Sequence, residues 1–196
     1  MRIVVSEFMS LDGVVQAPGG PDEDRDGGFA HGGWSFPYFD VDVMGAAVSE
    51  SLEHTSALLY GRRTWTTMAA AWPDRAGDPT ADFFNAVQKY VVSSTLTEAG
   101  VAHWAPTTIL RPDRLVDEIA SLKNAPGNDA LIWGSPTLVR SLLALRMVDE
   151  LLLMIEPITL GGGKSVFPDD GVARNFALRS VTQAATGVLL CRYVPA

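Results

Sequence analysis

The 196-residue sequence has little cysteine and little histidine: Cys191 is its one cysteine, and its three histidines are His31, His54 and His103. A single cysteine gives no internal disulfide, and the histidines share no spacing typical of metal ligands. Cys191 lies in an alternating apolar run, which indicates a small buried side chain. The sequence therefore predicts no metal site and no disulfide-stabilised scaffold.

The sequence also lacks long apolar runs and an excess of basic residues. No stretch approaches the roughly 18 uninterrupted apolar residues of a membrane span, and the first apolar run is too short for a signal peptide. With 15 Lys and Arg against 23 Asp and Glu, the formal net charge is −8, which repels nucleic-acid phosphates and anionic membranes. We therefore expect a cytoplasmic protein that binds neither nucleic acid nor membrane.

The composition is that of an ordinary globular protein, with 47% hydrophobic and 19% charged residues. Short apolar runs typical of strands alternate with stretches of helical periodicity through most of the chain. Residues 176–182 and 188–194 then alternate on either side of a short turn, which predicts an antiparallel hairpin. Because we see no repeat and no linker, we expect one domain over residues 1–196, an α/β fold with a mixed sheet covered on both faces.

Two stretches read as a strand, a glycine turn and a helix start. The first is LLYGRRTW, from Leu58 to Trp65, and it places two arginines beside the turn. The second runs from Ala130 into a helix through Gly134 and Ser135, with Ser135 expected to cap the helix ahead of Pro136. Backbone N–H groups at a helix start suit a phosphate group. For the first stretch, the alternative is a plain strand-to-helix turn with two solvated arginines.

The stretch from Ala17 to Trp34, APGGPDEDRDGGFAHGGW, is crowded with glycine and acid and has no hydrophobic period. We expect a long mobile loop. Ordered loops of this length are usually lids or binding loops, and Phe29, Trp34, Phe36 and Tyr38 give this one an aromatic edge that can close over a flat ligand. The alternative is an acidic, disordered insertion.

Two further helix starts carry polar residues suited to them. A helix is expected from Asp40 to about Glu53, with Asp40 or Asp42 at its start, where a carboxylate is favoured. Thr80 is the expected N-cap of a short helix that precedes the strand 89–92.

Five stretches in chain order resemble the dihydrofolate reductase fold: EFMSLDGVV, LLYGRRTW, YVVSSTL, LIWGSPTLVRSLL and DELLLMIEPITLGGGKSVF. The resemblance is closer to the branch that includes the reductase domain of bacterial riboflavin biosynthesis, the RibD C-terminal domain. It implies three α/β/α layers around a central mixed, mostly parallel sheet of about eight strands with a C-terminal antiparallel hairpin. It also implies a reduced nicotinamide cofactor across the strand ends. The zinc deaminase half of bifunctional riboflavin enzymes is not seen, so a stand-alone member is expected.

The resemblance implies that residues at the ends of three strands contact the cofactor. The matching residues are Gly61, Arg62, Arg63, Thr64, Ser93, Ser94, Gly134, Ser135 and Thr137. An arginine near Ser93 would favour NADPH over NADH, because the extra phosphate needs cations and hydroxyl donors. At the second turn, Gly134 and Ser135 stand where dihydrofolate reductases carry a glycine pair.

Ser10, Asp12 and Gly13 match the segment that lies near the nicotinamide and the substrate in the riboflavin branch. Trp34, from the aromatic edge, is a further candidate for contacting the substrate. The carboxylate that dihydrofolate reductases use as proton donor has no clear match in this chain. Asp12 and Asp42 are therefore the candidates for relaying a proton, directly or through water.

The resemblance implies an NADPH-dependent reductase that transfers hydride to a C=O or C=N bond of a small molecule, as in 5-amino-6-(5-phosphoribosylamino)uracil reductase and dihydrofolate reductase. The alternative is a non-catalytic pterin-, drug- or nucleotide-binding protein on the same fold. The family also suggests a homodimer, for which the apolar strands within 176–194 offer a pairing surface.

Overall fold

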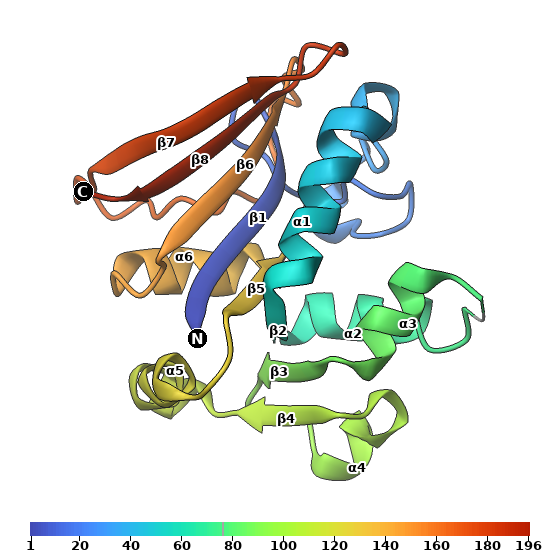
Figure 1. The fold of residues 1–196 in the computed structure, drawn as a ribbon, viewed down its shortest axis with the longest axis vertical. Helices are drawn as coiled ribbons and strands as arrows, with labels where there is room; N and C mark the ends of the chain where they lie inside the picture. The colour runs from blue at the N-terminus through green and yellow to red at the C-terminus, as the bar shows by residue number, and fades with distance from the viewer. Residues whose placement is uncertain (76) are drawn as a thin grey trace.

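The computed structural model describes residues 1–75 and 77–196, and its centre is one eight-stranded sheet (Figure 1). The strands are β1 (Arg2–Ser10), β2 (Thr55–Gly61), β3 (Gln88–Val92), β4 (Thr107–Leu110), β5 (Asp129–Trp133), β6 (Glu150–Glu156), β7 (Phe176–Gln183) and β8 (Leu189–Pro195). They lie in the order β4-β3-β2-β5-β1-β6-β8-β7.

Strands β1 to β6 pair in parallel with one another, and β8 pairs antiparallel with both β6 and β7. The parallel part follows from the chain itself, because helices connect these strands and return the chain to the same edge of the sheet. The C-terminal pair is joined by a short turn and forms the expected hairpin. The predicted fold class, with a mixed and mostly parallel sheet and a C-terminal antiparallel hairpin, is confirmed.

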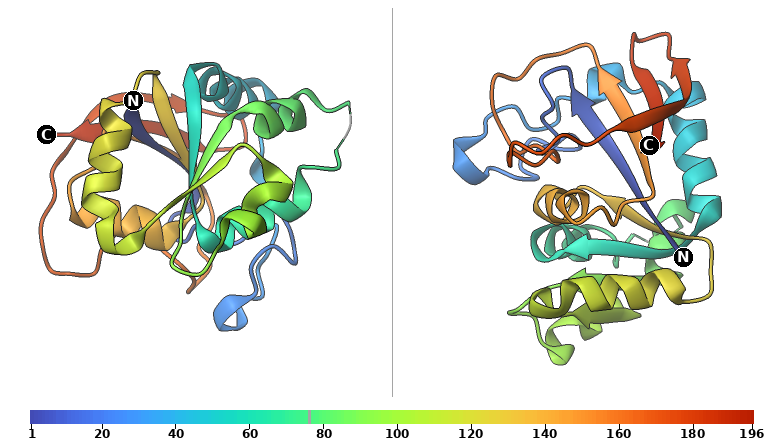
Figure 2. Two further views of the ribbon diagram at one scale, coloured as in Figure 1. Left: turned by 90° about the horizontal axis from the view of Figure 1, so that it is seen from below. Right: turned by 90° about the vertical axis from the view of Figure 1, so that its left-hand side faces the viewer.

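Helices cover both faces of the sheet (Figure 2). They are α1 (Ala46–His54), α2 (Arg62–Ala71), α3 (Pro79–Ala86), α4 (Glu98–Val101), α5 (Leu115–Asn124) and α6 (Pro136–Ala144). Helices α5 and α6 pack on one face around Ile119 and Leu142, whereas α2 and α3 pack on the other around Trp65 and Phe84. Helix α1 also lies on the side opposite α5 and α6. No helix in the described ranges is long and apolar enough to cross a membrane.

The start of α3 differs from the sequence expectation. Asp78, not Thr80, is the N-cap: its carboxylate accepts hydrogen bonds from the backbone N–H groups of Thr80 (2.8 Å) and Ala81 (3.4 Å). Pro79 then occupies the first helical position, where its missing N–H costs nothing. The helix expected from Asp40 begins as a π-helical turn, Val41–Gly45, and the Asp40 side chain accepts from the Val43 N–H, so a carboxylate does cap this start.

Candidate functional site

The two predicted phosphate turns lie side by side at the carboxyl ends of β2 and β5. Two hydrogen bonds join them: the Gly61 N–H donates to Ser135 Oγ (2.9 Å), and the Ser135 N–H donates to Thr64 Oγ1 (2.9 Å). Because β2 and β5 are neighbours in the parallel sheet, helices α2 and α6 both start at this point. We call Gly61–Thr64 together with Gly134–Thr137 the cradle.

Both helix starts in the cradle lack a side-chain cap. Gly61 has no side chain to offer, and Ser135, expected as the cap of α6, does not cap it. Ser135 instead adopts a left-handed conformation (φ 59°), and its hydroxyl is used by Gly61. The first N–H groups of a helix have no partner within the helix, so those of α2 and α6 are available to an anion. Gly134 is also left-handed (φ 66°), and a Cβ there would lie 3.2 Å from Thr64 Cγ2.

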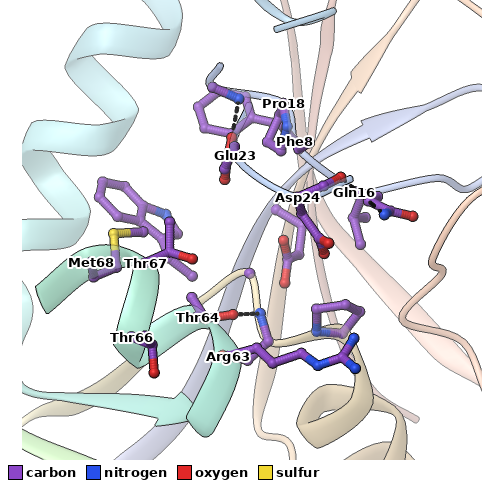
Figure 3. A pocket seen from close by; sticks show the side chains of 18 of the residues that line it. Phe8, Gln16, Pro18, Glu23, Asp24, Arg63, Thr64, Thr66, Thr67 and Met68 are labelled. Atoms are coloured by element: carbon purple, nitrogen blue, oxygen red, sulfur yellow. Dashed lines mark hydrogen bonds between the residues drawn. The ribbon is translucent and has the colours of Figure 1, made fainter. Parts of the chain in front are cut away.

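Two cavities adjoin the cradle. The larger has a volume of about 660 Å³ and reaches from the cradle to β1 and to residues 17–34, which we call the acidic loop. The smaller has a volume of about 340 Å³. Their shared lining residues are Asp24, Arg62, Arg63, Thr64, Ser135 and Pro136. In Figure 3, Asp24 and Glu23 face Thr64 and Arg63 across the larger cavity. The two cavities therefore share a wall at the starts of α2 and α6.

The smaller cavity combines apolar and anion-binding surfaces. Val92, Leu115 and Leu138 line it together with the arginines of the cradle and Lys164. A flat base can pack on the apolar side while its phosphates lie at the helix starts. The donors present thus fit a dinucleotide: cations and uncapped helix N-termini at the centre, with a cavity on each side.

The acidic loop closes over the cradle through ion pairs. The Asp26 carboxylate contacts both Arg63 and Lys164, and Lys164 also pairs with Asp24 (2.6 Å). Hydrogen bonds from Lys164 and Arg63 lower the pKa of Asp26 to about 2. Gln16 holds the same loop by donating to the carbonyls of Asp24 and Asp26.

Three side chains with a buried polar atom line the larger cavity and were not singled out from the sequence. Ser6 and Glu7 are 1% and 2% exposed, and with Trp133 they line this cavity. Ser6 Oγ, Glu7 Oε1 and Trp133 Nε1 are buried without a hydrogen-bond partner in the described part of the chain. One feature of the sequence indicates Ser6 and Glu7: they are a polar pair inside an otherwise apolar strand.

Ser10, Asp12 and Gly13 form a compact turn. Ser10 Oγ donates to Asp12 (2.5 Å), and the Gly161 N–H donates to the same carboxylate (2.8 Å). These hydrogen bonds, with Ser10 first, lower the pKa of Asp12. Gly13 supplies the positive φ of 81° that the turn needs. The Asp12 carboxylate therefore holds this turn against the segment that follows β6, and none of the three residues is part of the lining of either cavity.

The other predicted site residues also lie outside the lining of these two cavities. Trp34 is buried, and its Nε1–H donates to the Gln16 carbonyl (2.8 Å). Asp42 is exposed on the turn before α1. Ser93 is buried and its hydroxyl accepts from the N–H groups that follow it, whereas Ser94 is exposed. The structure thus brings together the predicted residues of the cradle but not these.

Comparison with known proteins agrees with the resemblance noted in the sequence. A family model described as "RibD C-terminal domain" matches residues 2–190. The uncharacterized protein YyaP of Bacillus subtilis (strain 168) is 25% identical over 197 residues, covering 98% of this chain and 94% of YyaP.

Solved structures share the fold. A putative riboflavin biosynthesis protein from Shewanella sp. PV-4 superposes with a TM-score of 0.70 at 20% identity, covering 100% of this chain and 99% of that one. A dihydrofolate reductase from Enterococcus faecalis, complexed with NADP(H) and RAB-propyl, gives a TM-score of 0.56 at 13% identity, covering 99% and 96%. These similarities show that the fold is shared.

Proposed function

The chain belongs to the RibD C-terminal domain family, and from that premise we propose that it is an NADPH-dependent reductase acting on a C=O or C=N bond of a small molecule. The observation that carries the proposal is the cradle. Two uncapped helix starts, joined by hydrogen bonds, adjoin two neighbouring cavities and two arginines.

In this proposal the cradle holds the phosphates of the dinucleotide. The free N–H groups at the starts of α2 and α6 bind phosphate oxygens, and Arg62 and Arg63 add charge-assisted hydrogen bonds. The smaller cavity takes the adenosine part. The larger cavity then takes the nicotinamide and the substrate, which places the reacting groups at the carboxyl ends of β1 and β5. When bound, the reduced nicotinamide supplies the hydride.

The cofactor site is tested by arginine substitutions. We expect Arg62→Ala and Arg63→Ala each to weaken NADPH binding about tenfold or more, because each removes a charged donor to phosphate. Titration calorimetry with NADPH and with NADH measures this, and a larger loss for NADPH would assign the arginine to the extra phosphate. Arg179→Ala is the matched control, because Arg179 is exposed on β7 at the far edge of the sheet. Unchanged NADPH affinity in both cradle variants would place the cofactor elsewhere.

Turnover separates a reductase from a protein that only binds. We expect the wild-type protein to consume NADPH, followed by absorbance, with at least one member of a panel of pterins, flavin precursors and quinones. NADPH binding without any turnover on the panel would favour the binding protein.

A further inference from the structure

Glu7 lies on β1 three residues before the strand ends at Ser10, and it is 2% exposed. Its Oε1 has no partner in the described chain, and the same is true of Ser6 Oγ and Trp133 Nε1, which line the same cavity. A buried polar atom without a hydrogen bond has lost its contacts with water and gained none in return. These atoms, with Glu7 on one face of β1 and Ser6 and Trp133 on the other, therefore indicate that a ligand in this cavity completes their hydrogen bonds.

Ser6 and Trp133 meet because of the sheet register. They are paired residues of β1 and β5, so their side chains lie on the same face near the carboxyl ends of the strands. Trp133 Nε1 can only donate a hydrogen bond, whereas the Ser6 hydroxyl can donate or accept. Together they suit a ligand that presents a nitrogen or oxygen acceptor.

The surroundings of Glu7 differ from those of a structural carboxylate. Asp129 is such a carboxylate, since both of its oxygens accept from Arg2 at 2.8 Å. Glu7 has no cationic partner among residues 1–75 and 77–196, and its contact is a hydrogen bond from the Gly134 backbone. Gly134 is part of the cradle, so Glu7 lies next to the proposed cofactor site.

The electrostatic setting of Glu7 favours its protonated form. Burial raises the pKa of Glu7 well above its ordinary value, the Gly134 hydrogen bond partly offsets this, and the charge of Glu23 raises it further. The charged and titratable side chains that line the same cavity are Glu7, Glu23, Asp24, Arg25, Asp26, Arg62 and Arg63.

We propose that Glu7 is the proton donor of the reaction, an inference that rests on the proposed reductase function. Hydride addition to the carbon of a C=O or C=N bond moves the π electron pair to the oxygen or nitrogen, which then takes the proton from the Glu7 carboxyl. Glu7 is left as a carboxylate and recovers a proton from solvent water. Asp12 and Asp42 are replaced in this role, because neither lines the larger cavity.

The cavity also limits the charge of the substrate. Glu7, Glu23, Asp24 and Asp26 line it, whereas its cations lie at the cradle and on the loop. A carboxylate or phosphate beside the protonated Glu7 would be repelled by the negative charges of Glu23, Asp24 and Asp26. The substrate class is therefore a small molecule whose reducible end is neutral or cationic.

The first test needs no substrate. We expect the infrared spectrum of the wild-type protein near neutral pH to contain the carbonyl band of a protonated carboxyl beside the band of Glu156, whose pKa is about 7, and Glu7→Gln to lose this second band. Glu23→Gln is the matched control. It keeps the Glu7 carboxyl but removes the neighbouring charge, so the band should persist and titrate at a lower pH than in the wild type. A wild-type protein without this band, or a Glu7→Gln protein that keeps it, overturns the proposal.

The second test uses the panel compound that the wild-type protein reduces. We expect Glu7→Gln to bind NADPH as the wild type does, to lose about 100-fold in kcat, and to lose the decline of kcat at alkaline pH. Glu7→Asp keeps a carboxyl group and should keep the decline of kcat at alkaline pH. It replaces Glu7→Gln as the test variant if Glu7→Gln does not fold. Wild-type kcat and pH profile in Glu7→Gln would overturn this proposal alone. A wild-type protein that does not bind NADPH would overturn it together with the proposed function.

Discussion

At the scale of single residues, Glu156 shows what a buried carboxyl does outside the site. It ends β6, is fully buried, and accepts a hydrogen bond from Ser35 Oγ at Oε1 (2.5 Å), while Oε2 has no partner in the described chain. Burial raises the pKa of Glu156 to about 7, and the Ser35 hydrogen bond offsets part of that rise. Because Ser35 follows the acidic loop, Glu156 ties the end of this loop to the sheet.

Glu156 should make stability depend on pH. Its pKa is about 7 in the folded chain and near 4.5 when unfolded, so between these values only the unfolded state ionises. The contribution of Glu156 to the free energy of unfolding is therefore largest below about pH 4.5 and falls until about pH 7. We expect Glu156→Gln to remove about 1 to 2 kcal/mol of this fall, allowing for solvent screening.

Urea unfolding of both proteins at about pH 4 and about pH 8 measures this difference. The quantity to compare is the change between the two pH values, because the new amide can alter stability equally at both. Identical pH dependence in the two proteins would show that Glu156 is ionised alike in the folded and unfolded states.

At the scale of elements, the bodies of strands and helices were predictable and their starts were less so. The apolar run 151–155 predicted β6, and the alternation of apolar and polar residues predicted the C-terminal hairpin. Both patterns extend over a whole element, because buried positions recur at regular spacing along it. The N-cap of α3 was misplaced because Asp78 and Thr80 both have capping side chains, and Pro79 decides between them. At α6, a tertiary hydrogen bond from Gly61 holds the Ser135 hydroxyl, and no local pattern contains that bond.

The same reasoning applies to the candidate site. The two turns of the cradle were predicted because each is encoded in one continuous stretch of sequence. The cluster of Ser6, Glu7 and Trp133 was not, since it depends on which strands are neighbours and on their register. A polar pair inside an apolar strand marks such a position in the sequence, but only the sheet order shows which residues it meets.

Lys89, at the junction of α3 and β3, tests how much a buried ammonium group contributes to the stability of the fold. Its ammonium group is buried and donates to the carbonyls of Phe84 (2.9 Å), Asn85 (3.2 Å) and Val87 (2.8 Å), which caps the end of α3. We expect Lys89→Met to lower the free energy of unfolding by about 1 to 3 kcal/mol, because three carbonyls lose their donor.

Denaturant unfolding measures the effect of Lys89→Met, and NADPH affinity should not change because Lys89 lines neither cavity. Lys123→Met is the control: Lys123 is a third exposed and pairs with Asp149 at 2.7 Å, so its loss should cost less than about 1 kcal/mol. Equal losses in the two variants would show that the carbonyl contacts of Lys89 contribute little.

At the scale of the whole molecule, β7 forms one edge of the sheet and is exposed along most of its length. Leu178 and Val181 on this strand are 52% and 53% exposed. Exposed apolar side chains on an open edge favour pairing with another chain. We therefore expect a homodimer in solution, formed through β7.

Size-exclusion chromatography with light scattering measures the mass. We expect twice the chain mass for the wild type and the chain mass for a Leu178→Glu, Val181→Glu double variant. Val116→Glu, on the exposed face of α5, is the control and should leave the mass unchanged. A monomeric wild type would contradict the prediction, and a dimeric double variant would place the interface elsewhere.

The ion pairs of Asp26 have a consequence for the affinity of the proposed site. Asp26 is attached to the same chain as Arg63 and Lys164, so it acts as a tethered competitor with a high local concentration beside them. An incoming anion must displace Asp26. The measured dissociation constant is then the intrinsic constant divided by the fraction of molecules in which the Asp26 ion pairs are broken. Competition by the acidic loop therefore raises the dissociation constant of every anion at this site. Only a ligand that makes several phosphate contacts binds tightly enough to displace Asp26.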